Sequence, residues 1–294
     1  MRSGFVSIIG RPNVGKSTLI NSLIDKKVAI TSKVAGTTRN VIQGIYNDDD
    51  YQIIFVDTPG IHKPIDKFGK VLNKQSLANT KDIDLLLFVV DVASGIGKGD
   101  KYILSMLKNN DIPVILVMNK IDRLTNEQLL KEINTYKDIY PFSEIVPVSA
   151  LKRDNTKHLL DVIKKYLKDD IMYFPKDLYT SSSIKFMASE IVREKLLAVC
   201  EEEVPHSITC YTTFYEEKKD IVNINVDIIV DRTNLKKIII GKNGSRLKQV
   251  GILARSEIEL LVNKKVYLEL YVKAIDNWKE KEKYLKELGF INNE

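Results

Sequence analysis

The sequence has little cysteine and no long hydrophobic run, and both absences narrow the class of protein. Cys200 and Cys210 are the only two cysteines in 294 residues; they form no CxxC pair and have no neighbouring set of metal ligands. We therefore expect reduced, structural thiols in a cytosolic protein rather than a disulfide framework or a zinc site. No apolar run approaches the roughly 20 residues that a transmembrane helix needs. The start, MRSGFVSIIG, enters a strand pattern at once, so we expect no signal peptide.

The bulk composition is typical of a folded globular protein. A length of 294 residues suggests about two domains, at roughly 100–200 residues each. Hydrophobic residues make up 44% of the chain and charged residues 29%. This apolar content is sufficient for buried hydrophobic cores. The formal net charge of +6 favours polyanionic partners but does not identify one.

The first half of the chain alternates short apolar stretches with helical patterns. Helical periodicity follows Lys16 and recurs at 100–108 and 126–140. The acidic turn at 47–50 indicates a pair of antiparallel strands, whereas near-continuous apolar runs are typical of strands covered on both faces. We therefore predict an α/β domain over 1–170, with a mostly parallel sheet and helices on both faces. Its strand candidates are 5–9, 51–57, 84–91, 113–119 and 145–149.

The second half has a different order of elements. The α/β alternation ends near Lys168, and the stretch FPKDLYTSSS is typical of a linker, which we place at 171–185. The second domain is then predicted at 186–294. Its expected elements are a helix at 187–203, strands at 208–215 and 221–231, a short helix, a glycine pair, a longer helix, a strand at 266–274 and a last helix at 278–288.

A phosphate-binding loop is predicted after the first strand. The residues GRPNVGKS match G-x-x-x-x-G-K-[ST] between a strand and a helix, which is the context that this motif requires. Its backbone N–H groups should cradle phosphate oxygens, Lys16 should reach the β- and γ-phosphates, and the Ser17 hydroxyl should bind Mg²⁺. The alternative is a chance glycine-rich turn. The candidate residues are Gly10, Arg11, Pro12, Asn13, Val14, Gly15, Lys16, Ser17 and Thr18.

A second motif, DTPG, follows the strand at 51–57. A carboxylate at the end of a strand, here Asp57, can hold Mg²⁺ through water. The backbone N–H of Gly60 can approach the γ-phosphate. Taken alone, the motif is equally good chemistry for an ordinary β-turn. The candidate residues are Asp57, Thr58, Pro59, Gly60 and Ile61.

Two further motifs identify the base. In NKID, the carboxylate of Asp122 can accept hydrogen bonds from guanine N1–H and its 2-amino group, which adenine does not offer in that geometry. The Lys120 stem can lie over the purine, and Asn119 can connect neighbouring loops. The Ser149-Ala150-Leu151 segment can supply a backbone donor to guanine O6. All four motifs follow strands, at the sheet edge where open α/β sheets bind ligands, so the sequence predicts a GTP site.

The chain resembles the translation-factor-like GTPases and, closely, the Era family. AGTTRN carries that family's Thr-Thr-Arg, and the resemblance implies that Thr38 completes the magnesium shell. It also implies catalytic roles for Lys16, Thr38, Asp57 and Gly60, and a potassium ion near Asn13, with Thr37 as a weaker candidate. Ile61 stands where many GTPases have a water-orienting glutamine, so we expect slow unaided hydrolysis. His62 is the only nearby imidazole, and a packing or exposed role is favoured over a catalytic one.

A nucleic-acid site is predicted in the second domain. IGKNG contains a GXXG loop between two helices, which KH domains use to clamp single strands. A lone GXXG is more often a turn with solvated lysines. The order helix–strand–strand–helix–GXXG–helix–strand resembles the type II KH domain, an α+β fold, at the C-terminus of Era proteins. The candidate residues are Lys236, Lys237, Ile240, Gly241, Lys242, Asn243, Gly244, Arg246 and Lys248.

The resemblance covers essentially the whole chain and implies a function. It implies a monomeric, cytoplasmic GTPase that binds GTP and GDP with Mg²⁺, binds small-subunit ribosomal RNA near its 3′ end, and assists assembly of the small ribosomal subunit. Peripheral association with the inner face of the cell membrane is a weaker implication. One alternative is an RNA-binding assembly factor whose nucleotide site is structural and does not turn over. Another is a related GTPase of tRNA modification or membrane traffic, which would not need the GXXG domain.

Overall fold

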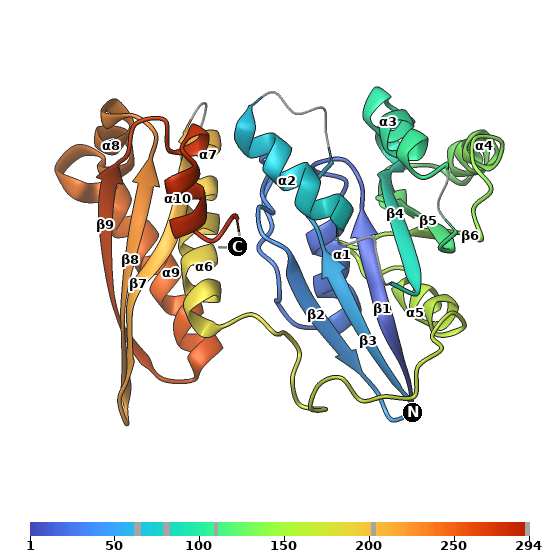
Figure 1. The fold of residues 1–294 in the computed structure, drawn as a ribbon, viewed down its shortest axis with the longest axis horizontal. Helices are drawn as coiled ribbons and strands as arrows, with labels where there is room; N and C mark the ends of the chain where they lie inside the picture. The colour runs from blue at the N-terminus through green and yellow to red at the C-terminus, as the bar shows by residue number, and fades with distance from the viewer. Residues whose placement is uncertain (62–65, 79–82, 109–110, 201–203, 292–294) are drawn as a thin grey trace. The chain divides into compact units, whose positions relative to one another are not determined.

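The computed structural model describes residues 1–61, 66–78, 83–108, 111–200 and 204–291. The chain divides into two compact units. Unit 1 consists of Met1–Ile65 and Gly69–Ser181, and unit 2 consists of Asp66–Phe68 and Ser182–Glu294. Each unit has its own sheet (Figure 1).

Unit 1 is built on a six-stranded sheet in the order β2-β3-β1-β4-β5-β6. Only β2 runs antiparallel to its neighbour; the other pairs are parallel, as predicted. The central strands are apolar because both faces of the sheet are covered. The strands are β1 (Arg2–Ile9), β2 (Ile42–Asn47), β3 (Tyr51–Asp57), β4 (Leu85–Asp91), β5 (Val114–Asn119) and β6 (Glu144–Val148).

Helices cover both faces of this sheet (Figure 1). On one face, side chains of β4 and β5 share a core cluster with Ile103 and Tyr136, which come from α3 and α4. On the other face, α1 contacts β2, β3 and α5. The helices are α1 (Lys16–Ile24), α2 (Lys67–Ala78), α3 (Lys98–Met106), α4 (Asn126–Lys137) and α5 (Thr156–Lys164), with short 3-10 turns η1 (Val92–Ser94) and η2 (Ile121–Arg123).

The segment predicted as a linker makes ordered contacts within unit 1. The amide of Gln52 accepts from the N–H groups of Tyr173 and Phe174 at 2.8 and 3.0 Å and donates to the Phe174 carbonyl at 2.8 Å. Thr180 forms an isolated bridge with Gly44 of β2. Because these bonds satisfy backbone groups at the sheet edge, the segment up to Ser181 packs as part of unit 1.

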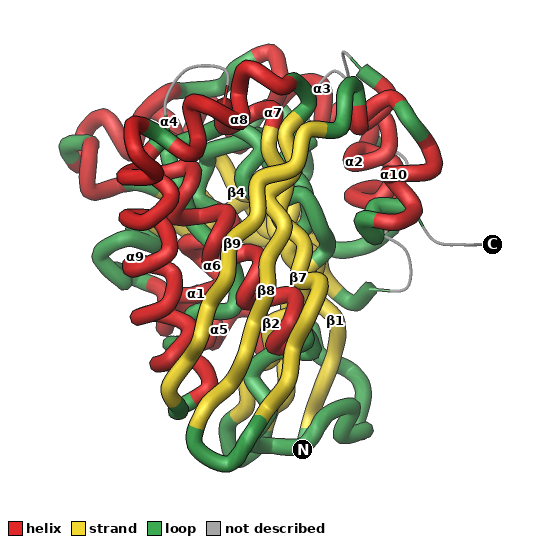
Figure 2. Tube along the Cα trace, turned by 90° about the vertical axis from the view of Figure 1, so that its left-hand side faces the viewer, coloured by secondary structure: helices red, strands yellow, loops and turns green. Residues whose placement is uncertain are grey.

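Unit 2 has a three-stranded sheet in the order β7-β8-β9, with β7 and β8 antiparallel and β8 and β9 parallel (Figure 2). Helices α6 and α9 pack against each other and against this sheet. The elements are α6 (Ile184–Val199), α7 (Val204–Ser207), β7 (Ile208–Glu217), β8 (Ile221–Val230), α8 (Thr233–Ile240), η3 (Lys242–Gly244), α9 (Ser245–Val262), β9 (Lys265–Ala274), η4 (Trp278–Glu280) and α10 (Glu282–Glu287).

Two helix boundaries in unit 2 differ from the sequence prediction. The first helix begins at Ile184 because the Ser183 hydroxyl accepts from the Phe186 N–H and caps it. The expected last helix at 278–288 is divided, because Lys281 is extended between η4 and α10. Among the described residues, no helix is both long and apolar enough to cross a membrane. Cys200 and Cys210 are both buried, and neither forms a disulfide in the described part of the chain.

Candidate functional site

The phosphate loop joins β1 to α1 and needs glycine where it passes the NKID motif. Gly15 has φ +98°, and a Cβ atom there would lie 2.3 Å from the Asn119 Nδ2. The loop can therefore lie against β5 only without a side chain at this position. The first turn of α1 follows at once, with its N–H groups available to an anion.

Lys16 is held inside the loop. Its Nζ lies 3.3 Å from the Gly10 carbonyl oxygen and 3.4 Å from that of Arg11. Burial lowers the pKa of Lys16, and the nearby carboxylate of Asp57 opposes this shift. A buried ammonium group that faces carbonyl oxygens is suited to bind a phosphate group, which would supply the missing negative charge.

Three oxygen-bearing side chains from separate segments meet beside Lys16. The Ser17 hydroxyl lies 2.8 Å from both Asp57 Oδ2 and Thr38 Oγ1, and the Thr38 hydroxyl lies 3.5 Å from Asp57 Oδ2. Burial raises the pKa of Asp57, while Lys16 and the hydroxyl groups oppose that shift. Within the described part of the chain, Asp57 Oδ1 is buried without a partner of good hydrogen-bond geometry. An all-oxygen set with a buried, under-satisfied carboxylate fits Mg²⁺.

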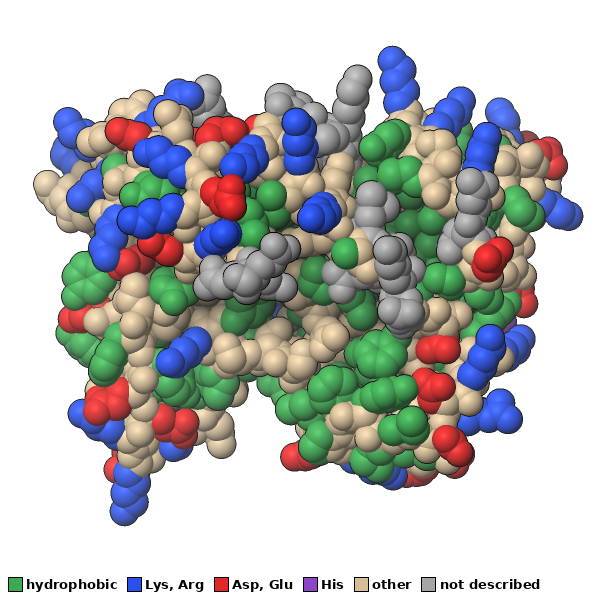
Figure 3. All heavy atoms as spheres, in the orientation of Figure 1, with side chains coloured by type: hydrophobic (Ala, Val, Ile, Leu, Met, Phe, Trp, Pro, Cys, Tyr) green, Lys and Arg blue, Asp and Glu red, His purple; other side chains and the backbone are tan. Residues whose placement is uncertain are grey.

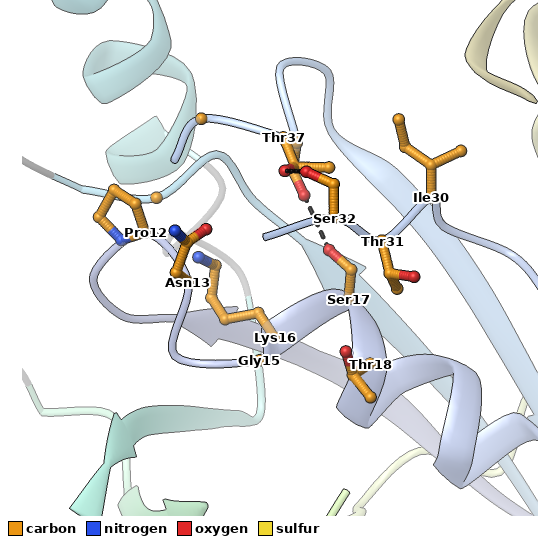
Figure 4. Close-up of a pocket in the computed structure, with 13 residues that line it drawn as sticks. Pro12, Asn13, Gly15, Lys16, Ser17, Thr18, Ile30, Thr31, Ser32 and Thr37 are labelled. Atoms are coloured by element: carbon orange, nitrogen blue, oxygen red, sulfur yellow. Dashed lines mark hydrogen bonds between the residues drawn. The ribbon is translucent and has the colours of Figure 1, made fainter. Parts of the chain in front are cut away.

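Two cavities adjoin these groups. The cavity beside Lys16 and Ser17 has a volume of about 50 Å³, and Figure 4 shows both side chains directed toward it. It is lined by Pro12, Asn13, Gly15, Lys16, Ser17, Thr18, Ile30, Thr31, Ser32, Gly36, Thr37, Thr38 and Gly60. The second, of about 480 Å³, is lined by Asn13, Gly15, Thr18, Thr31, Ser32, Lys33, Asn119, Lys120, Asp122, Arg123 and Leu151. The predicted phosphate and base motifs therefore line adjacent cavities.

Asn119 connects three loops, as the sequence predicted. Its Nδ2 donates to the Val14 carbonyl at 2.8 Å, and its Oδ1 accepts from the Ala150 N–H at 3.0 Å. The Ala150 N–H, one of the expected donors to guanine, is therefore engaged by Asn119 in this structure. Ser149 donates from its hydroxyl to Asp122 Oδ1 at 2.6 Å, which fixes the orientation of that carboxylate.

Asp91 is part of this site and the sequence reasoning missed it. Lys120 Nζ lies 2.6 Å from Asp91 Oδ2 and donates to the Asn13 carbonyl at 2.7 Å. The ammonium group thus joins the phosphate loop to the end of β4. The available signal was position: Asp91 ends an apolar strand at the same sheet edge as the other motifs.

Ile61 faces the core rather than the cavities. Its side chain is 1% exposed and belongs to the cluster that contains Ile9, Leu86 and Phe88. Its N–H donates to the Gly10 carbonyl at 3.2 Å. No polar group replaces a water-orienting glutamine at this position. His62 lies outside the described residues.

The segment with the Thr-Thr-Arg motif contacts the phosphate loop. Asn13 Nδ2 donates to the Lys33 carbonyl at 2.9 Å. Thr37 donates from its hydroxyl to the Val34 carbonyl at 2.6 Å, and its Oγ1 also lies 2.6 Å from the Ser32 Oγ (Figure 4). The side chains of Asn13 and Thr37 are therefore both near the cavity at the phosphate loop.

The GXXG loop of unit 2 opens onto a groove. Gly241 and Gly244 have φ of +74° and +75°, which favours glycine, and Asn243 also has a positive φ of +52°. The groove has a volume of about 460 Å³ and is lined by Gly244, Leu247, Lys248, Gly251, Ile252, Arg255, Leu268 and Leu270. The apolar residues of α9 and β9 were missing from our sequence prediction, although alternation along 266–274 could have indicated them.

Cationic side chains surround this loop. Lys236, Lys237, Lys242 and Lys248 are exposed, and Figure 3 shows lysine and arginine side chains gathered over the α8 end of the unit. Arg246 differs, because its Nη1 donates to the Ile238 carbonyl at 2.7 Å and so holds the end of α8. The groove thus combines exposed positive charge with an apolar floor, as single-strand recognition requires.

The fold and these two sites define a P-loop GTPase followed by a KH domain. The chain matches the family described as "50S ribosome-binding GTPase" over residues 5–120 and the family described as "KH domain" over residues 203–279. It is 45% identical to "GTPase Era" of Clostridium kluyveri over 291 residues, which cover 99% of both chains. The chain therefore belongs to the Era family, and it is a GTPase.

Two solved structures agree over the full length. Aquifex aeolicus Era bound to GDP and AlF4⁻ matches with a TM-score of 0.95 and 41% identity, covering 99% of each chain. A structure of Era in complex with MgGDPNP and nucleotides 1506–1542 of 16S ribosomal RNA matches with a TM-score of 0.96, the same identity and the same coverage. These matches confirm the predicted fold class.

Proposed function

We propose that this GTPase is a molecular switch that binds small-subunit ribosomal RNA near its 3′ end and assists assembly of the small subunit. The observation that carries the proposal is the presence, on one chain, of a phosphate-loop site in unit 1 and a cationic GXXG groove in unit 2. A relative that is 41% identical over 99% of this chain was solved with that RNA and with MgGDPNP.

We assign the nucleotide as follows. The phosphates lie against the loop 10–18, with Lys16 at the β- and γ-phosphates, and Gly60 approaches the γ-phosphate through its N–H. Ser17, Thr38 and Asp57 hold Mg²⁺, which when bound neutralises phosphate charge. The support is the Ser17 hydroxyl, which lies 2.8 Å from both Thr38 Oγ1 and Asp57 Oδ2, and the buried Asp57 Oδ1.

The base is assigned to the larger cavity. Asp122 accepts from guanine, and the Ser149 hydroxyl holds its carboxylate in place. Asn119 fixes the relative positions of the phosphate loop and the Ser149–Leu151 segment. The Asp122 carboxylate can pair with two guanine donors, whereas adenine would leave it unpaired, which is the physical basis of the proposed selectivity.

We also assign a site for a monovalent cation beside the nucleotide. We place K⁺ beside Asn13, whose amide lies at the loop that carries Thr37. An amide oxygen and backbone carbonyl groups are suitable ligands for a hard cation of low charge. A positive charge there would offset negative charge on the phosphates during hydrolysis.

The RNA is assigned to the groove between α9 and β9. The backbone phosphates pass the GXXG loop and the lysines that surround it, and the bases lie over the apolar side chains of Ile252, Leu268 and Leu270. Phosphate contacts supply affinity and position, whereas base edges supply sequence preference. We further propose that the protein acts as a monomer in the cytoplasm, with any membrane contact peripheral.

The test replaces the loop between the two glycines with acidic residues. Lys242→Asp combined with Asn243→Asp should weaken binding of a single-stranded RNA from the small-subunit 3′ end by at least about tenfold. Each lost phosphate contact should also lower the log–log salt slope by about 0.7. Fluorescence anisotropy over a salt series measures both quantities.

A matched control makes the same chemical change on α4. Lys131→Asp combined with Asn134→Asp alters two exposed residues of unit 1 by the same charge. Its RNA affinity should stay near that of the wild type if the effect is local to the groove. RNA binding by the GXXG variant at the wild-type level would reject the assignment of RNA to this groove and would leave the GTPase assignment unaffected.

A further inference from the structure

The side chain of Arg11 leaves the phosphate loop and is held by another part of unit 1. Its Nε lies 2.8 Å from Asp100 Oδ1, and its Nη2 donates to the Ser94 hydroxyl at 3.3 Å and the Gly95 carbonyl at 3.4 Å. All three partners lie in Asp91–Asp100, which we call the β4–α3 segment. The guanidinium group is therefore engaged away from the cavity beside Lys16.

The shape of the β4–α3 segment fits the Arg11 side chain. Asp100 is fully buried, and its second oxygen accepts from the Gly97 N–H at 2.8 Å. A Cβ atom at Gly97 or at Gly99 would come within 2.7 Å of the Arg11 side chain. The segment thus leaves room for the guanidinium and its stem, and supplies a buried carboxylate as the partner.

The same segment holds the phosphate loop at a second point. Asp91 Oδ2 lies 2.6 Å from Lys120 Nζ, which donates to the Asn13 carbonyl. Arg11 and Asn13 belong to the turn that precedes Gly15. The β4–α3 segment therefore holds this turn at two points. It binds the Arg11 side chain directly, and it binds the Asn13 carbonyl through Lys120.

We propose that Arg11 is a positioning residue that, through Asp100, keeps the phosphate loop in its nucleotide-binding conformation. Without this ion pair the loop has more conformations when it is free, and nucleotide binding must order it. The inference rests on the nucleotide site proposed above. It predicts loss of nucleotide affinity with a smaller effect on hydrolysis at saturating GTP, since bound nucleotide restores the loop.

The test compares nucleotide dissociation and steady-state kinetics in a set of variants. In Arg11→Ala and in Asp100→Asn, dissociation of a fluorescent GDP should become about tenfold faster, equivalent to about 1.4 kcal/mol. KM for GTP should rise while kcat falls by less than about threefold. The combined variant should be no worse than either single variant, because both remove one interaction. Arg11→Lys, which keeps one charged donor, should be intermediate.

Two reference variants separate failure of this inference from failure of the nucleotide assignment. Arg2→Ala removes an exposed arginine at the far end of β1 and should behave as wild type. Lys16→Ala should lose nucleotide binding. If Lys16→Ala binds poorly while Arg11→Ala dissociates GDP at the wild-type rate, Arg11 is not a positioning residue. Additive effects of Arg11→Ala and Asp100→Asn, or a parallel fall in kcat and melting temperature, would also overturn the inference. Normal binding by Lys16→Ala would overturn the nucleotide assignment and the inference together.

Discussion

Replacing Asp122 with asparagine reverses part of the hydrogen-bonding character of the side chain assigned to guanine. The carboxylate has two acceptor oxygens, and Ser149 donates to one of them at 2.6 Å, so its orientation is fixed before nucleotide binds. Asparagine keeps one acceptor and places an NH₂ group where the 2-amino group of guanine should donate. The hydrogen bond from the guanine 2-amino group to the carboxylate is lost, and the asparagine NH₂ group then faces that amino group, donor against donor.

The expected size follows from these contacts. Hydrogen bonds to a charged group contribute about 1.5–3 kcal/mol each. Losing the hydrogen bond to the 2-amino group and weakening the one to N1–H should reduce the binding free energy by about 3–4 kcal/mol. This corresponds to a factor of about 150–1,000 in the dissociation constant of GTP. Xanthosine triphosphate has a carbonyl at the position of the amino group, so Asp122→Asn should bind it more tightly than GTP.

Competition against a fluorescent guanine nucleotide measures these affinities. GTP, ATP and xanthosine triphosphate are compared for wild type, Asp122→Asn and Ser149→Ala, the last of which removes only the orienting hydroxyl. Ser149→Ala should weaken GTP by about tenfold or less, without a change of preference. Equal affinity of the wild type for ATP and GTP would refute the base assignment. An unchanged GTP preference in Asp122→Asn would do the same.

Two further predictions concern the phosphate loop. Hydrolysis should be faster in potassium than in sodium, and Asn13→Ala should remove this difference, because its amide is assigned to the cation; equal phosphate release in both salts for the wild type would contradict the potassium assignment. Gly15→Ala should lower the stability of unit 1 by about 1–3 kcal/mol, because φ is +98° and the new Cβ would lie 2.3 Å from Asn119 Nδ2. Thermal unfolding measures this change, and an alanine variant as stable as the wild type would show that the loop does not require glycine.

The four nucleotide motifs could be predicted because each combines a local backbone requirement with a strand end. GRPNVGKS needs a glycine at position 15 for the loop to pass Asn119, and NKID follows a short apolar run that is typical of a buried strand. In a parallel sheet the carboxyl ends of the strands share one edge, so their relative placement followed from the alternation alone.

The contacts that hold those motifs together could not be predicted in the same way. Arg11 and Asp100 are 89 residues apart, and Lys120 and Asp91 are 29 apart. Local pattern carries no information about such pairs, and in the sequence each residue taken alone is an ordinary charged residue. The packing of the segment near Tyr173 on Gln52 was missed for a related reason: its composition is that of a linker, while its backbone groups pair with a buried amide.

Ile61 connects the core of unit 1 to the hydrolysis rate that we expect. The residue directly follows Gly60, whose N–H is assigned to the γ-phosphate, yet its side chain is 1% exposed and packs with residues of β1 and β4. Its N–H is bound to the Gly10 carbonyl, so both backbone and side chain are held. A polar residue at 61 in this conformation would bury an unpaired group rather than orient a water molecule. The attacking water must therefore be positioned by groups other than residue 61, and for this reason we expect slow unaided turnover although candidate phosphate and magnesium residues are present.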